Sequence, residues 1–331
     1  MRPETVVLAA ALLASVGAGG VAAQQAGVAR LSAAVLDVAP PSARVRGEPG
    51  GMTLQPGACP ALPAGASRRR IVDIAAQEWG FFGFRVAAPT DFDDTNPLRP
   101  DSTDGNPPGD RRRGGRGRLP PAEAARVAAS IAGYWAVTPE GAWIVARQNE
   151  AWRGPFGIAT RWNAPWSAAF ISWVMCEAGL GAPAQFRHAI AHHAYIDQAI
   201  RARDGREPQG AFVAYDPGEA SIEPGDLLCS SRRPIYRSIA ERRRQMGVGA
   251  RSHCDIVVSV DEQHVRAIGG NVRGVVSLKA FPVTRAPGTP VRVANLDDER
   301  PMFAHLKLRA TSIASAALDS SPTATRRSGS E

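Results

Sequence analysis

Hydrophobic residues recur at helical intervals in four stretches of the chain. These stretches are residues 67–79, 120–135, 163–181 and 188–201. In each one, apolar side chains three or four positions apart form a stripe that would face a core. We therefore predict four helices, and the third should be the most deeply buried because two tryptophans and a phenylalanine fall on its stripe.

The third predicted helix is marked at both ends. Asn163 can cap the first turn, Pro165 suits a position whose N–H would have no partner, and Gly179 can supply a left-handed stop. Ser167 falls in the first turn, where unpaired N–H groups and the helix dipole favour a developing negative charge. A nucleophile would be well placed there.

Short apolar runs replace the helical pattern in the C-terminal part of the chain. They cover residues 227–229, 254–260, 264–270, 275–279, 291–294 and 303–308. The turns between several of them are short, which is typical of antiparallel neighbours. The sequence therefore predicts an α+β fold in which helices pack on a small antiparallel sheet.

The N-terminus has the features of an export signal. Arg2 precedes an apolar run from Val6 to Val16, and small residues end at Ala23, after which we expect cleavage. This run is shorter than the roughly 20 residues of a membrane-spanning helix. We expect residues 1–23 to be a signal peptide and the protein to be periplasmic or secreted, with no membrane span after the signal is removed.

Composition divides the remainder of the chain. Residues 24–66 are rich in Ala, Pro and Gly and predict a disordered linker, and small polar residues at 311–331 predict a disordered tail. One domain is expected over residues 67–310, with a mobile insertion at about 87–120. The net charge of +8 invites a nucleic-acid partner, but five arginines at 111–118 follow directly on an acidic stretch, so we expect none.

The chain has four cysteines, an even number in a protein that we expect to reach an oxidising compartment. They are Cys59, Cys176, Cys229 and Cys254. Three complete pairings remain open, although Cys229 and Cys254 fall on predicted strands that could be neighbours. The close spacing of a zinc ribbon is missing.

Several motifs that bind cofactors or metals are absent from the sequence. There is no phosphate-binding loop, no glycine fingerprint for a dinucleotide and no His-Glu-x-x-His. His188 and His192 have the spacing of two metal ligands on one helix face, but no third ligand has a matching position. We therefore expect neither a cofactor nor a metal.

Four motifs then follow one another along the chain. They are Trp166-Ser-Ala-Ala-Phe-Ile-Ser-Trp173, Pro224-Gly-Asp-Leu227, His253-Cys-Asp-Ile-Val257 and Gly269-Gly-Asn271. In this order they resemble the papain-like superfamily of NlpC-type and CHAP amidases and endopeptidases. Within it, the first motif, Glu78-Trp79 and the paired glycines resemble a bacterial family of unknown function, DUF2272. The resemblance covers roughly residues 71–282 and implies a papain-like fold.

The superfamily places a nucleophilic Cys at a helix start, where this chain has Ser167. By resemblance, His253 would be the general base, Asn271 would orient its imidazole, and N–H groups at the helix start would bind the oxyanion. The substrate would be peptidoglycan or another envelope glycopeptide, cleaved at an amide. Its groove would be lined by Trp166, His192, Tyr195 and Asp226.

Two alternatives remain open at this point. The chain is either a cell-envelope hydrolase of the amidase or endopeptidase type, or a catalytically inactive exported module that binds envelope glycopeptide. A Ser hydroxyl is a far poorer nucleophile than a thiolate without a well-placed base. In the second case, Ser167 would make only a local backbone bond and His253 would be a satisfied strand residue.

Overall fold

The computed structural model describes residues 27–55, 57–62, 65–91, 120–285 and 289–328. The predicted signal peptide and most of the predicted insertion lie outside these residues. Helices and strands both contribute heavily to the described part of the chain, which confirms the α+β class.

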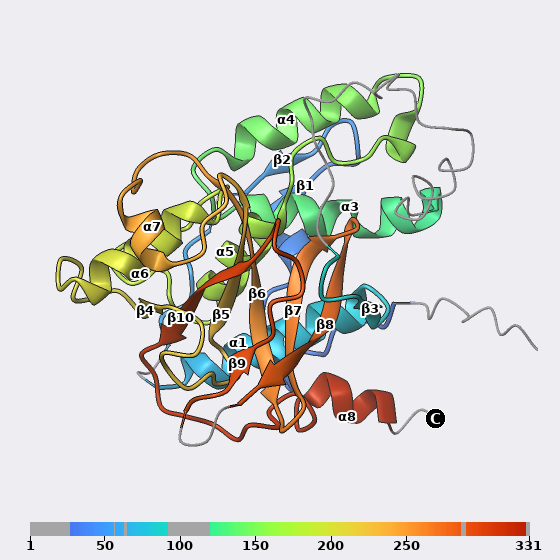
Figure 1. Cartoon of the computed structure of the whole chain (residues 1–331). Coiled ribbons are helices and arrows are strands. Elements are labelled where there is room, and N and C mark those ends of the chain that lie inside the picture. Colours follow the sequence, from blue (N-terminus) through green and yellow to red (C-terminus); the bar gives the residue numbers. More distant parts are fainter. Residues whose placement is uncertain (1–26, 56, 63–64, 92–119, 286–288, 329–331) are drawn as a thin grey trace, which may run out of the picture.

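A mixed sheet forms the centre of the molecule (Figure 1). Its strand order is β3-β8-β7-β6-β5-β10-β4, and β9 pairs with β8 off this path. The strands are β3 Arg85–Ala87, β4 Phe212–Tyr215, β5 Leu227–Arg233, β6 Arg251–Val260, β7 His264–Val272, β8 Val275–Thr284, β9 Arg292–Val293 and β10 Met302–Leu308. All neighbours are antiparallel except β3, which runs parallel to β8. A second, two-stranded sheet pairs β1 Val45–Arg46 with β2 Thr53–Leu54.

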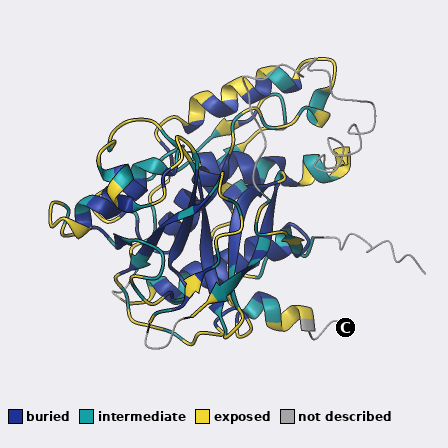
Figure 2. Cartoon of the chain, viewed as in Figure 1, coloured by how far each residue is buried: buried dark blue, intermediate teal, exposed yellow. Residues whose placement is uncertain are grey.

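Helices pack on the large sheet or on one another. They are α1 Ser67–Phe81, α3 Pro121–Trp135, α4 Gly141–Trp152, α5 Ser167–Glu177, α6 His193–Arg203, α7 Ile239–Arg243 and α8 Pro322–Ser328, with 3₁₀ turns η1 Pro41–Arg44 and η3 Gly157–Ala159. Helix α5 packs on β6 and β7, and α6 packs on β4. The central strands and α5 are buried, whereas α4 and α8 expose one side (Figure 2). The predicted burial of the third helix is confirmed, since every residue of α5 is buried.

Side-chain alternation along β6 divides the core in two. Cys254, Ile256 and Val258 belong to the large cluster shared with the helices, whereas Val257 belongs to a smaller cluster on the opposite face with Phe281. This alternation follows from the two-residue period of a strand. It also assigns His253 and Asp255 to the face opposite Cys254, the face that α5 does not cover.

The segment predicted as a disordered linker contacts the helices at several described positions. Arg30 forms an ion pair with buried Glu78, and Arg44 forms one with Glu177. A disulfide joins Cys59 to Cys176 near the end of α5. Composition alone misses these contacts because an Ala- and Pro-rich segment can be ordered by a few buried arginines.

The C-terminal segment also differs from the expected disordered tail. Ala317 and Leu318 are buried, and the Leu318 N–H donates to the Val258 carbonyl of β6. Helix α8 then packs on α1. The small side chains of this segment let its backbone pack close to β6. The small, polar composition from which we predicted disorder does not indicate this packing.

Most predicted elements are present, but helices α4, α7 and α8 and strands β1 to β4 were not predicted. Helix α4 lies between the second and third predicted helices, β4 lies between the fourth predicted helix and the first predicted strand, and α7 lies just before β6. Two helices also start later than predicted, at Ser167 and His193. The Asn163 N–H instead donates to Gln148, and no side chain caps α5.

Candidate functional site

Ser167 is the first residue of α5, and the residue before it is held rigidly. The Trp166 ring stacks on Phe82 and Tyr134, with centroids 5.9 and 5.7 Å away. The Trp166 carbonyl accepts the Phe170 N–H, which closes the first turn of the helix. Ser167 is therefore held in the first turn of the helix, where backbone N–H groups lack intrahelical partners.

The Ser167 hydroxyl is hydrogen-bonded to an imidazole. Ser167 Oγ lies 2.7 Å from Nε2 of His192, the residue just before α6. The other ring nitrogen, Nδ1, is hydrogen-bonded to the Tyr195 hydroxyl one turn further along. Ser167 and His192 are 6% and 4% exposed, so this chain of three polar groups is almost closed to solvent.

The environment keeps His192 neutral. Burial lowers the pKa of His192 well below its usual value, and the neighbouring His253 lowers it further. Burial also raises the pKa of the Tyr195 hydroxyl well above its ordinary value, so this group keeps its proton. A neutral imidazole is the form that can accept a proton from a serine.

A second polar cluster begins at His253 on β6. Its Nε2–H donates to Asp255 Oδ1 over 3.0 Å, and Lys279 Nζ on β8 donates to Asp255 Oδ2 over 3.2 Å. All three side chains are buried. Gly269 on β7 leaves the space for them, since a Cβ there would lie 1.9 Å from Asp255 Oδ1.

Charge pairing decides the protonation of this second cluster. Burial raises the pKa of Asp255, but Lys279 and His253 outweigh burial and hold that pKa well below its usual range. Burial lowers the pKa of Lys279 and of His253, and Asp255 opposes both shifts. The carboxylate therefore stays ionised between an ammonium and an imidazole.

The two clusters lie next to each other through their imidazoles. The ring centroids of His192 and His253 are 5.5 Å apart. The hydrogen-bond partner of the Ser167 hydroxyl is nevertheless His192, whereas His253 bonds to Asp255. This arrangement differs from the sequence-based expectation, in which His253 contacts the serine.

A family model described as "Uncharacterized protein conserved in bacteria (DUF2272)" matches residues 124–308. The chain belongs to this family. The matched region runs from within α3 to the end of β10 and so includes both polar clusters. No curated protein and no solved structure matches the chain.

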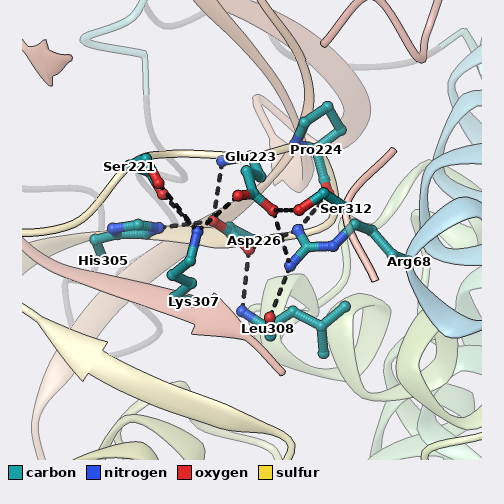
Figure 3. A network of polar contacts seen from close by, with 9 residues as sticks. All are labelled: Arg68, Ser221, Glu223, Pro224, Asp226, His305, Lys307, Leu308 and Ser312. Atoms are coloured by element: carbon teal, nitrogen blue, oxygen red, sulfur yellow. Dashed lines mark hydrogen bonds and ion pairs between the residues drawn. The ribbon is translucent and has the colours of Figure 1, made fainter. Parts of the chain in front are cut away.

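Two of the residues that we predicted to line a groove are buried in this DUF2272 member. Trp166 is 1% exposed in the aromatic core. Asp226 is fully buried, where it accepts hydrogen bonds from Arg68 and His305 (Figure 3). Ser230 on β5 is the register partner of His253, and Asp226 lies four residues before Ser230. Asp226 is therefore about 13 Å along the chain from the position opposite His253. A role for either residue in lining a groove stays a prediction.

Asn271 is buried near the end of β7, and its backbone is left-handed, with a φ of 57°. Asn adopts this conformation at lower cost than most residues. The position therefore has a structural reason to hold Asn, in addition to the orienting role that we expected for it.

The residues that the sequence analysis missed are Asp255 and Lys279. The spacing of His253 and Asp255 was a usable signal, since residues i and i+2 share a strand face. Lys279 carried no such signal, because its place beside Asp255 depends on β6, β7 and β8 being neighbours.

The histidines before α6 do not form a metal site. His188 and His192 precede the helix rather than sharing a face of it, and His192 uses both ring nitrogens in hydrogen bonds. Across the described ranges, we find no group of three His, Cys, Asp or Glu side chains that could hold a metal ion. None of the helices in the same ranges has both the length and the apolar character needed to cross a membrane.

Proposed function

We propose that this protein is a cell-envelope amide hydrolase with Ser167 as nucleophile and His192 as general base. The observation that carries the proposal is the 2.7 Å hydrogen bond between Ser167 Oγ and His192 Nε2 at the start of a buried helix. A nucleophile and a base within hydrogen-bond reach, with the base held by a third group, are the usual elements of acyl transfer. Tyr195 is that third group.

The reaction would run in two halves. Ser167 Oγ attacks the amide carbonyl carbon while its proton passes to His192 Nε2, and N–H groups in the first turn of α5 stabilise the oxyanion. The imidazolium then protonates the amine nitrogen as the C–N bond breaks, leaving an acyl ester on Ser167. His192 then accepts a proton from water as the water oxygen attacks the ester carbonyl carbon. It returns that proton to Ser167 Oγ as the acyl C–O bond breaks and the acid product is released.

This mechanism requires one tautomer of His192. Nε2 has to be unprotonated to accept the serine proton, so Nδ1 carries the hydrogen and donates it to the Tyr195 oxygen. The raised pKa of Tyr195 keeps its hydroxyl neutral and able to accept this bond. Tyr195 thus takes the role that the sequence analysis gave to Asn271.

We still expect His253 to take part in the reaction, but not as the general base. Its ring lies beside that of His192, and the Asp255 carboxylate is 3.0 Å from its Nε2. Asp255 favours a positive charge on either ring, as its effect on the pKa of both histidines indicates. The pair would stabilise the imidazolium that forms on His192 during the reaction.

The envelope location and the substrate are further parts of the proposal. Both disulfides support an oxidising compartment, consistent with the export signal expected at residues 1–23. The packing of α5 on β6 and β7, with Ser167 at its start, supports the resemblance to NlpC-type and CHAP enzymes. We therefore expect peptidoglycan peptides, or their amide link to sugar, as the substrate.

The test is hydrolysis of peptidoglycan fragments by the purified protein, with products identified by mass spectrometry. We expect wild type and Ser167→Cys to release product, and Ser167→Ala and His192→Ala to release none. Ser312→Ala is the matched control, since this exposed serine bonds only Glu223 among the described residues. Equal product release by wild type and Ser167→Ala would rule out the assignment.

A second candidate function is a catalytically inactive module that binds envelope glycopeptide. The near-complete burial of Ser167 and His192 favours it, because a hydroxyl and an imidazole that satisfy each other can be purely structural. In that case wild type and Ser167→Ala would bind peptidoglycan equally in a sedimentation assay, and neither would release product.

A further inference from the structure

Two arginines face each other across β5 and β6. Arg233 and Arg251 are register partners, and both are exposed. Neither has an ion pair or a side-chain hydrogen bond in the part of the chain that the structure describes. Like charges directly opposite each other on a sheet are destabilising, so this placement costs stability unless an anion binds between them.

The arginine pair lies close to the proposed reaction centre. Arg251 is two residues before His253 on β6, so both side chains leave the same face of the strand about 7 Å apart. The His253 ring is in turn 5.5 Å from that of His192, which bonds to Ser167. The strand pairing is irregular between Ser231 and Arg233, and such bulges often redirect side chains next to active sites.

Positive charge predominates around the arginine pair, which favours the binding of an anion. Arg232, the neighbour of Arg233, lowers the pKa of both His192 and His253, so its positive field reaches the reaction centre. Asp255 is already bonded to Lys279 and His253, and Asp91, which also acts on Lys279, is paired with Arg273. An anionic group approaching from solvent would therefore meet a net positive edge of the sheet.

We infer that Arg233 and Arg251 form a subsite for a carboxylate of the substrate, next to the amide that is cleaved. Guanidinium groups bind carboxylates through two parallel hydrogen bonds, which fixes the orientation of the ligand as well as its charge. The inference rests on the proposed function and narrows its substrate class to acidic peptides. An amide far from any carboxylate would be a poor substrate.

The test measures binding without turnover. Ser167→Ala protein is titrated, by calorimetry, with a peptidoglycan stem peptide as the free acid and with its carboxylates converted to carboxamides. We expect the free acid to bind at least about tenfold more tightly, as for hydrogen bonds to charged groups. Adding Arg233→Gln and Arg251→Gln should abolish this preference.

The matched control replaces Arg161 and Arg206 by Gln, which removes the same charge from two exposed arginines elsewhere. It should keep the preference for the free acid. Binding of both peptides with equal affinity, or a preference that survives in the Arg233/Arg251 variant, would overturn the subsite. Thermal unfolding of each variant confirms that it is folded, and we expect no loss of stability in either.

The outcome is separable from that of the proposed function. If wild type cleaves neither peptide but still binds the free acid more tightly in an arginine-dependent way, the subsite is supported and the hydrolase assignment is wrong. If wild type cleaves both peptides at equal rates and binds them with equal affinity, the hydrolase assignment is supported and the subsite is wrong.

Discussion

The buried ion pair of Asp226 gives a quantitative prediction about stability. Asp226, Arg68 and His305 are all fully buried, and the Asp226 carboxylate accepts hydrogen bonds from Arg68 Nη1 and His305 Nε2, each over 2.8 Å (Figure 3). The Leu308 N–H donates a further bond over 3.0 Å. Asp226→Ala leaves the guanidinium buried without its carboxylate, and we expect a loss of about 3–5 kcal/mol in the free energy of unfolding.

Urea unfolding followed by tryptophan fluorescence measures this loss. The matched control is Glu223→Gln. Glu223 is the second carboxylate near Arg68, at 3.5 Å, but its side chain is 25% exposed, so we expect a loss of about 1 kcal/mol or less. A loss below about 1 kcal/mol for Asp226→Ala, at an unchanged slope with urea, would refute the assignment of Asp226 to a stabilising ion pair.

Three further predictions concern pH, a buried carboxylate and the proposed base. The pKa of Asp226 is lowered because His305 and Arg68 outweigh its burial, and the pKa of Asp255 is lowered as well. The contribution of both carboxylates to the free energy of unfolding should therefore be fully present above about pH 5 and be lost as the pH falls further, which unfolding followed by circular dichroism measures. Glu78→Gln should cost about 3 kcal/mol in urea unfolding, since Glu78 is buried against Arg30. Tyr195→Phe should lower kcat at least about tenfold with little change in KM, because His192 loses its orienting partner.

The sequence predicted those parts of the fold that depend on local periodicity. Each of the four predicted helices overlaps an observed helix along most of its length, because each buries an apolar stripe. Helix α4 escaped notice because Trp143 is exposed on it, which breaks the expected pattern. The disulfide between Cys229 and Cys254 could be anticipated from neighbouring strands, whereas that between Cys59 and Cys176 could not, since the two residues are 117 positions apart.

The candidate site was predictable only in part. Ser167 could be found because a helix start is a local feature. His192 was expected near it as a groove residue, but its bond to Ser167 depends on how the segment before α6 returns to the start of α5. The spacing of apolar residues does not predict the path of this segment. The resemblance to papain-like enzymes instead directed attention to the strand histidine, His253.

The N-terminal segment has a role in the site that its composition conceals. At the end of α5, Arg44 pairs with Glu177 and Cys59 is bonded to Cys176. At its start, Arg30 pairs with Glu78, which is hydrogen-bonded to the hydroxyl of Tyr134, and the Tyr134 ring stacks on Trp166. Residues before α1 therefore contribute to fixing α5, the helix of the proposed nucleophile, at both ends. Because acyl transfer depends on the position of one hydroxyl relative to one imidazole, removal of this segment should impair the chemistry even though none of its residues contacts Ser167 through a described bond.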